Sequence, residues 1–215
     1  MPTRLTWVFD LDNTLHNASP HIFPHINRSM TAYLQQQLQL SEEDAGNLRA
    51  HYWRSYGATL LGMMRHHGTD PEHFLRETHA LPDLSVMVVY ERGLAAMLRR
   101  LPGRKLVLSN APLHYARSVL QTMGIDGQFD AVHSIESTGY RPKPSLAAFR
   151  SLLRTHSLIA SRCVMVEDSR ENLRQAKRLG MKTVWVTREP RAPAYVDAKT
   201  NSVLTLPRLL GRLGP

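Results

Sequence analysis

Two carboxylates, Asp10 and Asp12, stand one residue apart directly after an apolar run near the start of the chain. The run from Leu5 to Phe9 has the composition of a strand buried on both faces. Two such charges raise each other's pKa and lose solvent, a cost that a bound cation such as Mg²⁺ offsets while leaving room for a substrate phosphate. The stretch predicts a carboxylate nucleophile beside a metal ion. The alternative interpretation is a helix cap formed by Asp12 or Asn13.

Alternating strands and helices are predicted for the second part of the chain, which indicates a parallel sheet covered on both faces. After the first strand, strands are expected at 105–108, 129–133, 162–166 and 182–186, irregular chain at 190–200, and a last strand at 202–204. Helices are expected at 90–101, 113–123, 145–155, 171–179 and 207–213. The predicted fold class is therefore α/β, with a Rossmann-like, doubly wound parallel sheet.

A block without strand alternation separates the Asp-x-Asp turn from this pattern. Helices are expected at 21–38, from a capping box at Ser41 to Gly68, and from Asp70 to about residue 81. The predicted domains are a core of residues 1–16 and 88–215 and an inserted α-helical cap of residues 17–87.

Three predicted strands end in polar clusters, and the carboxyl ends of parallel strands form one ligand-binding edge. A fourth cluster surrounds Lys143, whose flanking prolines restrict its backbone in a loop before a helix. Taken alone, each cluster has an ordinary explanation, such as a helix cap or a solvated lysine. Their joint placement at one edge favours a single site. The residues concerned are Asp10, Asp12, Ser109, Asn110, Lys143, Glu167 and Asp168.

Carboxylates from two different strands are predicted to hold one Mg²⁺ at this edge. The side chains of Asp10 and Asp168 are the expected ligands, with the backbone carbonyl of Asp12 as a third. Glu167 is expected to act through a water molecule.

Phosphoryl transfer through an aspartyl-phosphate fits this set of residues. Asp10 is the predicted nucleophile, and Mg²⁺ and Lys143 stabilise the equatorial oxygens of the phosphoryl group. Asp12 protonates the leaving alkoxide and later deprotonates the attacking water. Ser109 and Asn110 are expected to donate hydrogen bonds to phosphoryl oxygens at the start of a helix.

These clusters resemble the four motifs of the haloacid dehalogenase superfamily, and the resemblance covers essentially the whole chain. The helical block resembles the C1-type cap of that superfamily. The resemblance implies a Mg²⁺-dependent phosphatase with a mobile lid. Dehalogenases of the superfamily lack the second carboxylate of the Asp-x-Asp motif, so the presence of Asp12 favours phosphate chemistry. It also implies that Thr14, Glu167 and Asn172 support the groups that touch metal and substrate. The matching motifs are Asp10-x-Asp12-Asn13-Thr14-Leu15, Ser109-Asn110, Lys143 and Glu167-Asp168-x-x-x-Asn172.

The segment Tyr52-Trp53-Arg54-Ser55-Tyr56-Gly57 is similar to a run in the pyrimidine 5′-nucleotidase branch of that superfamily. This resemblance implies a nucleotide substrate, contacted by His16, Arg54 and Tyr56. The chain departs from the branch at His16 and Trp53, where tyrosine is usual, and it lacks the Pro-Asp-Pro that usually follows the cap. Gly57 is expected inside a helix, at a cost of about 1 kcal/mol relative to alanine. One interpretation is the close approach of a ligand or of another backbone segment, and the other is a packing role for this glycine.

Composition narrows the class of protein. The chain has 215 residues and a formal net charge of +9, which could indicate a nucleic-acid-binding protein. Its arginines, however, are dispersed and are not interleaved with aromatic residues. A solvated basic surface is therefore favoured over a nucleic-acid site. A single cysteine, Cys163, excludes an internal disulfide and is expected to be a packed core thiol in a reducing, cytoplasmic compartment. No membrane association is expected, because no run is long enough to span a bilayer and no signal-peptide pattern is present.

The predicted function is a Mg²⁺-dependent phosphomonoesterase of the 5′-nucleotidase type, acting on pyrimidine nucleoside 5′-monophosphates. One alternative is a phosphatase or mutase for sugar phosphates or another small phosphate ester. A second alternative is a non-enzymatic nucleic-acid-binding protein, which predicts binding that weakens steeply with salt and no hydrolysis of aryl phosphates. The sequence carries no signal for an oligomeric state.

Overall fold

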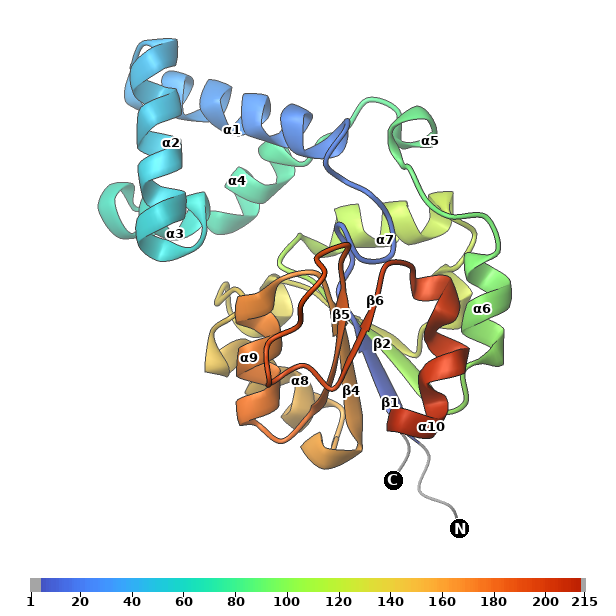
Figure 1. Ribbon diagram of the computed structural model, residues 1–215. Helices are drawn as coiled ribbons and strands as arrows, with labels where there is room; N and C mark the ends of the chain where they lie inside the picture. The colour runs from blue at the N-terminus through green and yellow to red at the C-terminus, as the bar shows by residue number, and fades with distance from the viewer. Residues whose placement is uncertain (1–4, 214–215) are drawn as a thin grey trace. The chain divides into compact units, whose positions relative to one another are not determined.

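The computed structural model describes residues 5–213, which divide into two compact units. The core unit contains the residues up to Asn17 together with those from Val88 onward, and the cap unit contains Ala18–Met87. In Figure 1 the core unit is a sheet flanked by helices, and the cap unit is a group of helices.

The core unit is built on a six-stranded parallel sheet in the order β3-β2-β1-β4-β5-β6. This topology confirms the predicted fold class. Because β1 lies between β2 and β4, chain order reverses at the strand that leads into Asp10, and open α/β sheets bind ligands at such a point. The strands are β1 (Thr6–Phe9), β2 (Arg104–Leu108), β3 (Ala131–His133), β4 (Cys163–Glu167), β5 (Lys182–Val186) and β6 (Ala198–Thr200).

Helices cover both faces of the sheet, with α8 and α9 on one side and α6 and α10 on the other (Figure 1). Val8 and Met165 of the sheet belong to one buried cluster with Phe149 of α8 and Leu173 of α9. Residues Trp7 and Phe9, which alternate with Val8, are also fully buried, so β1 is apolar on both faces. The helices are α6 (Leu94–Arg100), α7 (Leu113–Thr122), α8 (Leu146–Thr155), α9 (Arg170–Arg178) and α10 (Leu210–Leu213), with 3₁₀ turns η1 (Asp126–Gln128), η2 (Glu136–Thr138), η3 (Ala160–Arg162) and η4 (Val203–Leu209).

Some predicted boundaries in the core unit are wrong. The last strand is β6 at Ala198–Thr200, inside the stretch expected to be irregular, whereas the strand expected at 202–204 belongs largely to the 3₁₀ turn η4. A three-residue strand is too short to show a period in its sequence. The helix expected from residue 90 begins only at Leu94, after Gly93 with a φ of +94°.

Two helices of the cap unit, α2 and α4, begin at the predicted caps. The Ser41 hydroxyl accepts a hydrogen bond from the N–H of Asp44, and the Asp70 carboxylate accepts from the N–H groups of Glu72 and His73. The short helix α5 was not predicted. The helices are α1 (Ile22–Leu38), α2 (Glu42–Tyr56), α3 (Thr59–His67), α4 (Pro71–Thr78) and α5 (Leu84–Met87).

The single helix expected between Ser41 and Gly68 is broken at Gly57. This glycine ends α2 with a φ of +80°, and nothing lies within 4 Å of the position that its Cβ would take. The predicted close approach of another backbone segment at Gly57 is therefore wrong, and so is the predicted placement of Gly57 inside a helix. Close approach occurs instead at Gly62 of α3, where a Cβ would lie 2.1 Å from Cγ of the buried Tyr52. Helices α2 and α3 pack closely because residue 62 has no side chain.

We expect Gly62→Ala to destabilise the protein by about 1–3 kcal/mol, because the added methyl group overlaps the Tyr52 ring. Gly46→Ala is the matched control, since Gly46 lies inside α2 with nothing within 4 Å of its Cβ position. That change is expected to stabilise by about 0.5–1 kcal/mol through helix propensity. Urea unfolding of both variants measures the difference. Equal effects of the two substitutions would show that the Tyr52 contact does not limit residue 62.

The chain leaves and re-enters the core unit through paired segments. The N–H of Asn17 donates to the carbonyl of Val89 over 2.7 Å, and the two residues form an antiparallel bridge. Asn17 precedes the cap unit in sequence and Val89 follows it closely. The cap sequence is thus inserted between two adjacent points of the core unit.

Two expectations from composition can be compared with the structure. Cys163 is fully buried at the start of β4, and burial raises the pKa of its thiol to about 11, as expected for a packed core residue. Within residues 5–213, no helix has both the length and the apolar character needed to cross a bilayer.

Candidate active site

A tight turn after β1 carries both acidic residues of the first motif. The N–H groups of residues 14–16 converge on the carbonyl oxygen of Leu11, at 2.9–3.4 Å. Asn13 has a φ of 61°, in the left-handed region that asparagine tolerates better than most residues. The turn brings His16 back beside Asp12.

Lys143 joins the ends of two strands. Its Nζ donates to Oδ1 of Asp10 after β1 over 2.6 Å, and to Oε2 of Glu167 at the end of β4 over 2.8 Å. All three side chains are buried. The structure therefore brings together three residues that the sequence placed on separate segments.

Glu167 and the loop that follows it are held by further donors. Nδ2 of Asn172 donates to Oε2 of Glu167 over 3.0 Å, and the N–H of Ser169 donates to Oε1 over 3.2 Å. The indole of Trp185 donates to the carbonyl of Asp168 over 2.8 Å, a contact that the sequence did not predict. Asn172 thus holds Glu167 in place, and its predicted support of the groups that touch metal and substrate remains a prediction.

Asn110 binds the backbone of the Lys143 loop through its side-chain amide. The N–H of Lys143 donates to Oδ1 over 2.7 Å, and Nδ2 donates to the carbonyl of Lys143 over 3.1 Å. Ser109 is buried, and its hydroxyl oxygen accepts from the N–H of Ala111 over 3.0 Å, which leaves the hydroxyl hydrogen for another acceptor. Among residues 5–213, none accepts a hydrogen bond from the backbone N–H of Leu11 or Asn110. These groups are available to a phosphoryl oxygen.

Three carboxylates face one buried ammonium group in this site. Burial and the Glu167 carboxylate raise the pKa of Asp10 to about 7, although Lys143 acts in the opposite direction. Burial also raises the pKa of Glu167 to about 7, and it raises the pKa of Asp168. Burial opposes the charge of Lys143, but the Asp10 and Glu167 carboxylates more than offset it and raise the pKa of that lysine. The site carries more negative than positive charge when its acids are ionised.

The donor set fits a divalent cation. Asp10, Glu167 and Asp168 each offer an oxygen, and these atoms lie within 4.8 Å of one another. Oxygen donors of this kind suit Mg²⁺, which would also offset the excess of negative charge. Both oxygens of Glu167 accept hydrogen bonds from the protein, so Asp10 and Asp168 are the more available ligands.

Asp12 receives two hydrogen bonds on one oxygen. Nε2 of His16 lies 3.0 Å from its Oδ1, and the hydroxyl of Tyr115 in α7 donates to the same atom over 2.5 Å. Tyr115 was not predicted, because an aromatic residue on a helix gives the same sequence signal as an ordinary core residue. Thr14 is buried beside this turn, and its hydroxyl has no hydrogen-bond partner among the described residues.

The sequence profile of haloacid dehalogenase-like hydrolases matches residues 6–192. The chain belongs to this family. The match includes every residue that the structure gathers around Lys143.

Among curated proteins, this hydrolase is similar to two that are named phosphoglycolate phosphatase. It is 24% identical to the protein of Colwellia psychrerythraea, over 84% of this chain and 83% of the relative. It is 29% identical to the protein of Rhodospirillum rubrum, over 86% of this chain and 82% of the relative.

Solved structures share the fold. The HAD phosphatase from Thermococcus onnurineus superposes with a TM-score of 0.70 at 19% identity, covering 96% of this chain and 98% of that one. The L-2-haloacid dehalogenase from Xanthobacter autotrophicus superposes with a TM-score of 0.62 at 16% identity, covering 97% and 98%. Because phosphatase and dehalogenase share this fold, the fold alone does not select the reaction of the hydrolase.

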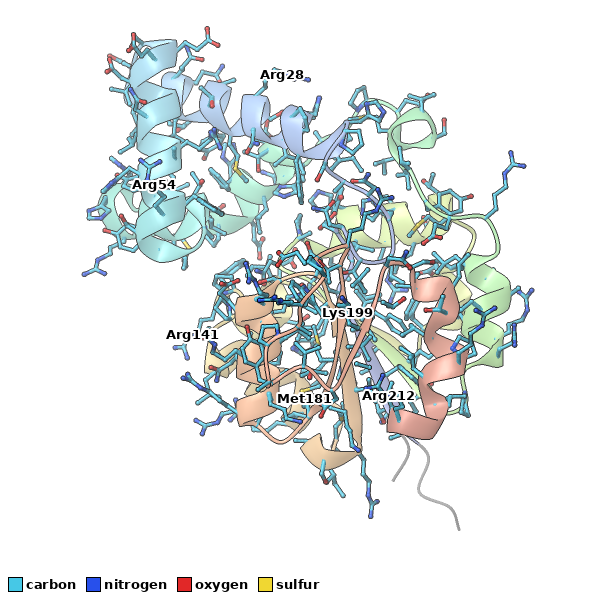
Figure 2. All side chains as sticks on the ribbon, in the orientation of Figure 1. Arg28, Arg54, Arg141, Met181, Lys199 and Arg212 are labelled. Carbon is cyan, nitrogen blue, oxygen red and sulfur yellow. The ribbon has the colours of Figure 1, made fainter. Side chains whose placement is uncertain are left out.

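The three predicted substrate contacts of the hydrolase lie in different units. His16 belongs to the core unit, and its side chain is fully enclosed against Asp12. In the cap unit, the hydroxyl of Tyr56 lies 2.7 Å from Nε2 of His66. Arg54 is exposed near the end of α2 (Figure 2). The roles of His16, Arg54 and Tyr56 as substrate contacts remain predictions.

Proposed function

We propose that this hydrolase is a Mg²⁺-dependent phosphomonoesterase that passes the phosphoryl group of a small phosphate ester to Asp10 and then to water. The observation that carries the proposal is the 2.6 Å contact between Asp10 and the buried Lys143, beside carboxylates that fit a divalent cation. Family membership supports hydrolysis as the reaction class.

In the first step, a carboxylate oxygen of Asp10 bonds to phosphorus while the ester P–O bond breaks. Lys143 and the free backbone N–H groups of Leu11 and Asn110 stabilise charge on the equatorial oxygens. Asp12 gives its proton to the leaving alkoxide. Asp10 and Asp168 would hold a Mg²⁺ ion, which would supply further positive charge beside the phosphoryl group.

In the second step, water attacks the phosphorus of the aspartyl-phosphate. Asp12, now ionised, accepts a proton from this water, and the bond between phosphorus and Asp10 breaks. Inorganic phosphate leaves, and both carboxyl groups return to their starting protonation.

The second acid favours phosphate esters over haloacids as substrates. An alkoxide is a poor leaving group and needs a proton, whereas a halide leaves without one. Asp12 is held by two hydrogen bonds close to the nucleophile, an arrangement that a dehalogenase would not require.

Two substrate classes compete. The relatives named phosphoglycolate phosphatase favour a hydroxy-acid or sugar phosphate, which we place first. The cap resemblance at Tyr52–Gly57 favours a pyrimidine nucleoside 5′-monophosphate, which we place second because His16 and Trp53 depart from that pattern.

The test is a panel of phosphate esters incubated with the purified protein and Mg²⁺, with released phosphate measured. The panel holds phosphoglycolate, sugar phosphates, pyrimidine and purine nucleoside monophosphates, and p-nitrophenyl phosphate. We expect the highest kcat/KM for one of the first two groups. A preference for pyrimidine nucleotides would reverse the ranking of the two substrate classes. Conversion of a sugar phosphate into its isomer without release of phosphate would indicate a mutase. Hydrolysis of none of the esters would refute the proposal.

Removal of the metal is expected to abolish activity. EDTA should stop phosphate release, and added Mg²⁺ should restore it. Because a ligand that binds only the folded state stabilises it, Mg²⁺ should raise the melting temperature of the wild type and not that of Asp168→Ala. Full activity in EDTA would contradict the metal assignment.

A further inference from the structure

The acid–base carboxylate is held asymmetrically. Both hydrogen bonds to Asp12 end on Oδ1, from Tyr115 over 2.5 Å and from Nε2 of His16 over 3.0 Å. Within residues 5–213, no hydrogen bond reaches Oδ2. The donors come from different parts of the core unit, since His16 ends the turn after β1 and Tyr115 lies in α7.

Both groups are donors in these contacts. Tyr115 is almost completely buried, and burial together with the Asp12 and Asp10 carboxylates raises the pKa of its hydroxyl, which therefore keeps its proton. A carboxylate oxygen can only accept, so Nε2 carries the hydrogen of the His16 ring. Nδ1 of His16 is buried and has no hydrogen-bond partner among the described residues, so the contact of Nε2 with Asp12 is the one that orients the ring.

The two hydrogen bonds to Oδ1 determine which oxygen of Asp12 can be protonated. An aspartate carboxyl group otherwise turns easily about its broad, two-fold χ2 torsion, which exchanges its two oxygens. A proton on Oδ1 would displace one of the two donors, whereas a proton on Oδ2 displaces none. Oδ2 is therefore the oxygen from which a proton can be transferred.

We propose that Tyr115 is a positioning residue, which with His16 fixes Oδ1 of Asp12 so that the transferred proton is carried on Oδ2. The inference rests on the phosphatase function proposed above. In this role Tyr115 acts through Asp12, to which its hydroxyl donates, and not on the substrate.

Leaving-group dependence separates positioning from a merely structural role. Tyr115→Phe removes the hydroxyl and keeps the ring. For the alkyl phosphate hydrolysed fastest in the panel, which needs a proton on its leaving group, we expect kcat/KM to fall about 10–100-fold, mostly in kcat. For p-nitrophenyl phosphate, whose leaving group needs no proton, we expect a loss of less than about threefold in kcat/KM.

The matched control is Tyr33→Phe. Tyr33 is also buried, and its hydroxyl also meets a histidine, Nδ1 of His73 at 2.9 Å, but both residues belong to the cap unit. This variant should alter both substrates by less than about twofold, since it leaves Asp12 unchanged.

A second measurement follows the contact without any substrate. Urea unfolding of the wild type, Tyr115→Phe, Asp12→Ala and the double variant forms a cycle. Tyr115→Phe should lower the unfolding midpoint clearly in the wild type and less than half as much beside Asp12→Ala.

Two results would overturn the proposal while the phosphatase function stands. The first is that Tyr115→Phe lowers kcat/KM equally for the alkyl and the aryl substrate, or lowers it for neither. The other is the same midpoint shift with and without the Asp12 carboxylate. A wild type that hydrolyses no phosphate ester would overturn the proposed function and, with it, this role.

Discussion

Asp10→Asn is expected to lower phosphate release by at least about 10³-fold while the fold is retained. The amide keeps the size of the carboxylate but is a far weaker nucleophile, so the covalent step is lost and only positioning and electrostatic effects remain. Burial disfavours the charge of the Asp10 carboxylate, and Lys143 keeps Glu167 as a charged partner when Asp10 becomes neutral, so the fold should be retained. Phosphate release and circular dichroism measure the two effects.

The control for this change is Asp126→Asn. Asp126 pairs with Arg117 on the surface of the same unit, over 3.0 Å, and surface ion pairs contribute little to stability. Its activity should equal that of the wild type. A ³²P-labelled substrate should also mark the peptide that contains residue 10 in the wild type and leave it unlabelled in Asp10→Asn. Label on another peptide would assign the nucleophile elsewhere.

Lys143→Met is expected to reduce both turnover and stability. Methionine fills a similar volume but leaves the buried carboxylates of Asp10 and Glu167 without their shared partner. Removing one partner of a buried ion pair typically costs about 3–5 kcal/mol. Loss of one positive group from the transition state lowers kcat by about 10²–10³-fold. Urea unfolding in EDTA and steady-state kinetics with Mg²⁺ measure the two effects separately.

Lys177→Met tests whether burial is the cause. Lys177 contacts Asp197 at 2.6 Å, the same distance as Lys143 from Asp10. Unlike Lys143 and Asp10, however, the side chains of Lys177 and Asp197 are both partly exposed. We expect this variant to lose less than about 1 kcal/mol and to keep its activity. Comparable destabilisation by the two methionines would mean that contact distance, and not burial, governs these pairs.

The sheet and most helices followed from the sequence because their signals are local. The apolar run of β1 and the caps at Ser41 and Asp70 depend on residues within a few positions of each other. The break at Gly57 was missed because a helix-breaking glycine and a glycine packed inside a helix give the same local pattern. The three-residue strand β6 was missed because it carries no period.

The candidate site was predictable in its acids and less so in its contacts. Parallel topology brings strand ends to one edge, so Asp10, Lys143 and Glu167 were expected to meet there, and they do. Which donor faces which acceptor depends on side-chain packing between distant segments. The sequence therefore gave no sign that the side-chain amide of Asn110 binds the Lys143 backbone, or that Tyr115 contacts Asp12.

The bridge between Asn17 and Val89 marks a position at which the cap unit could be replaced by protein engineering. Since the two residues already exchange a backbone hydrogen bond, a short turn could join them in place of the seventy residues of Ala18–Met87. The proposed nucleophile Asp10, Lys143 and the carboxylates around it all lie outside the excised stretch. Grafting a foreign helical insert at this junction would therefore leave in the sequence every residue that the structure gathers around Lys143.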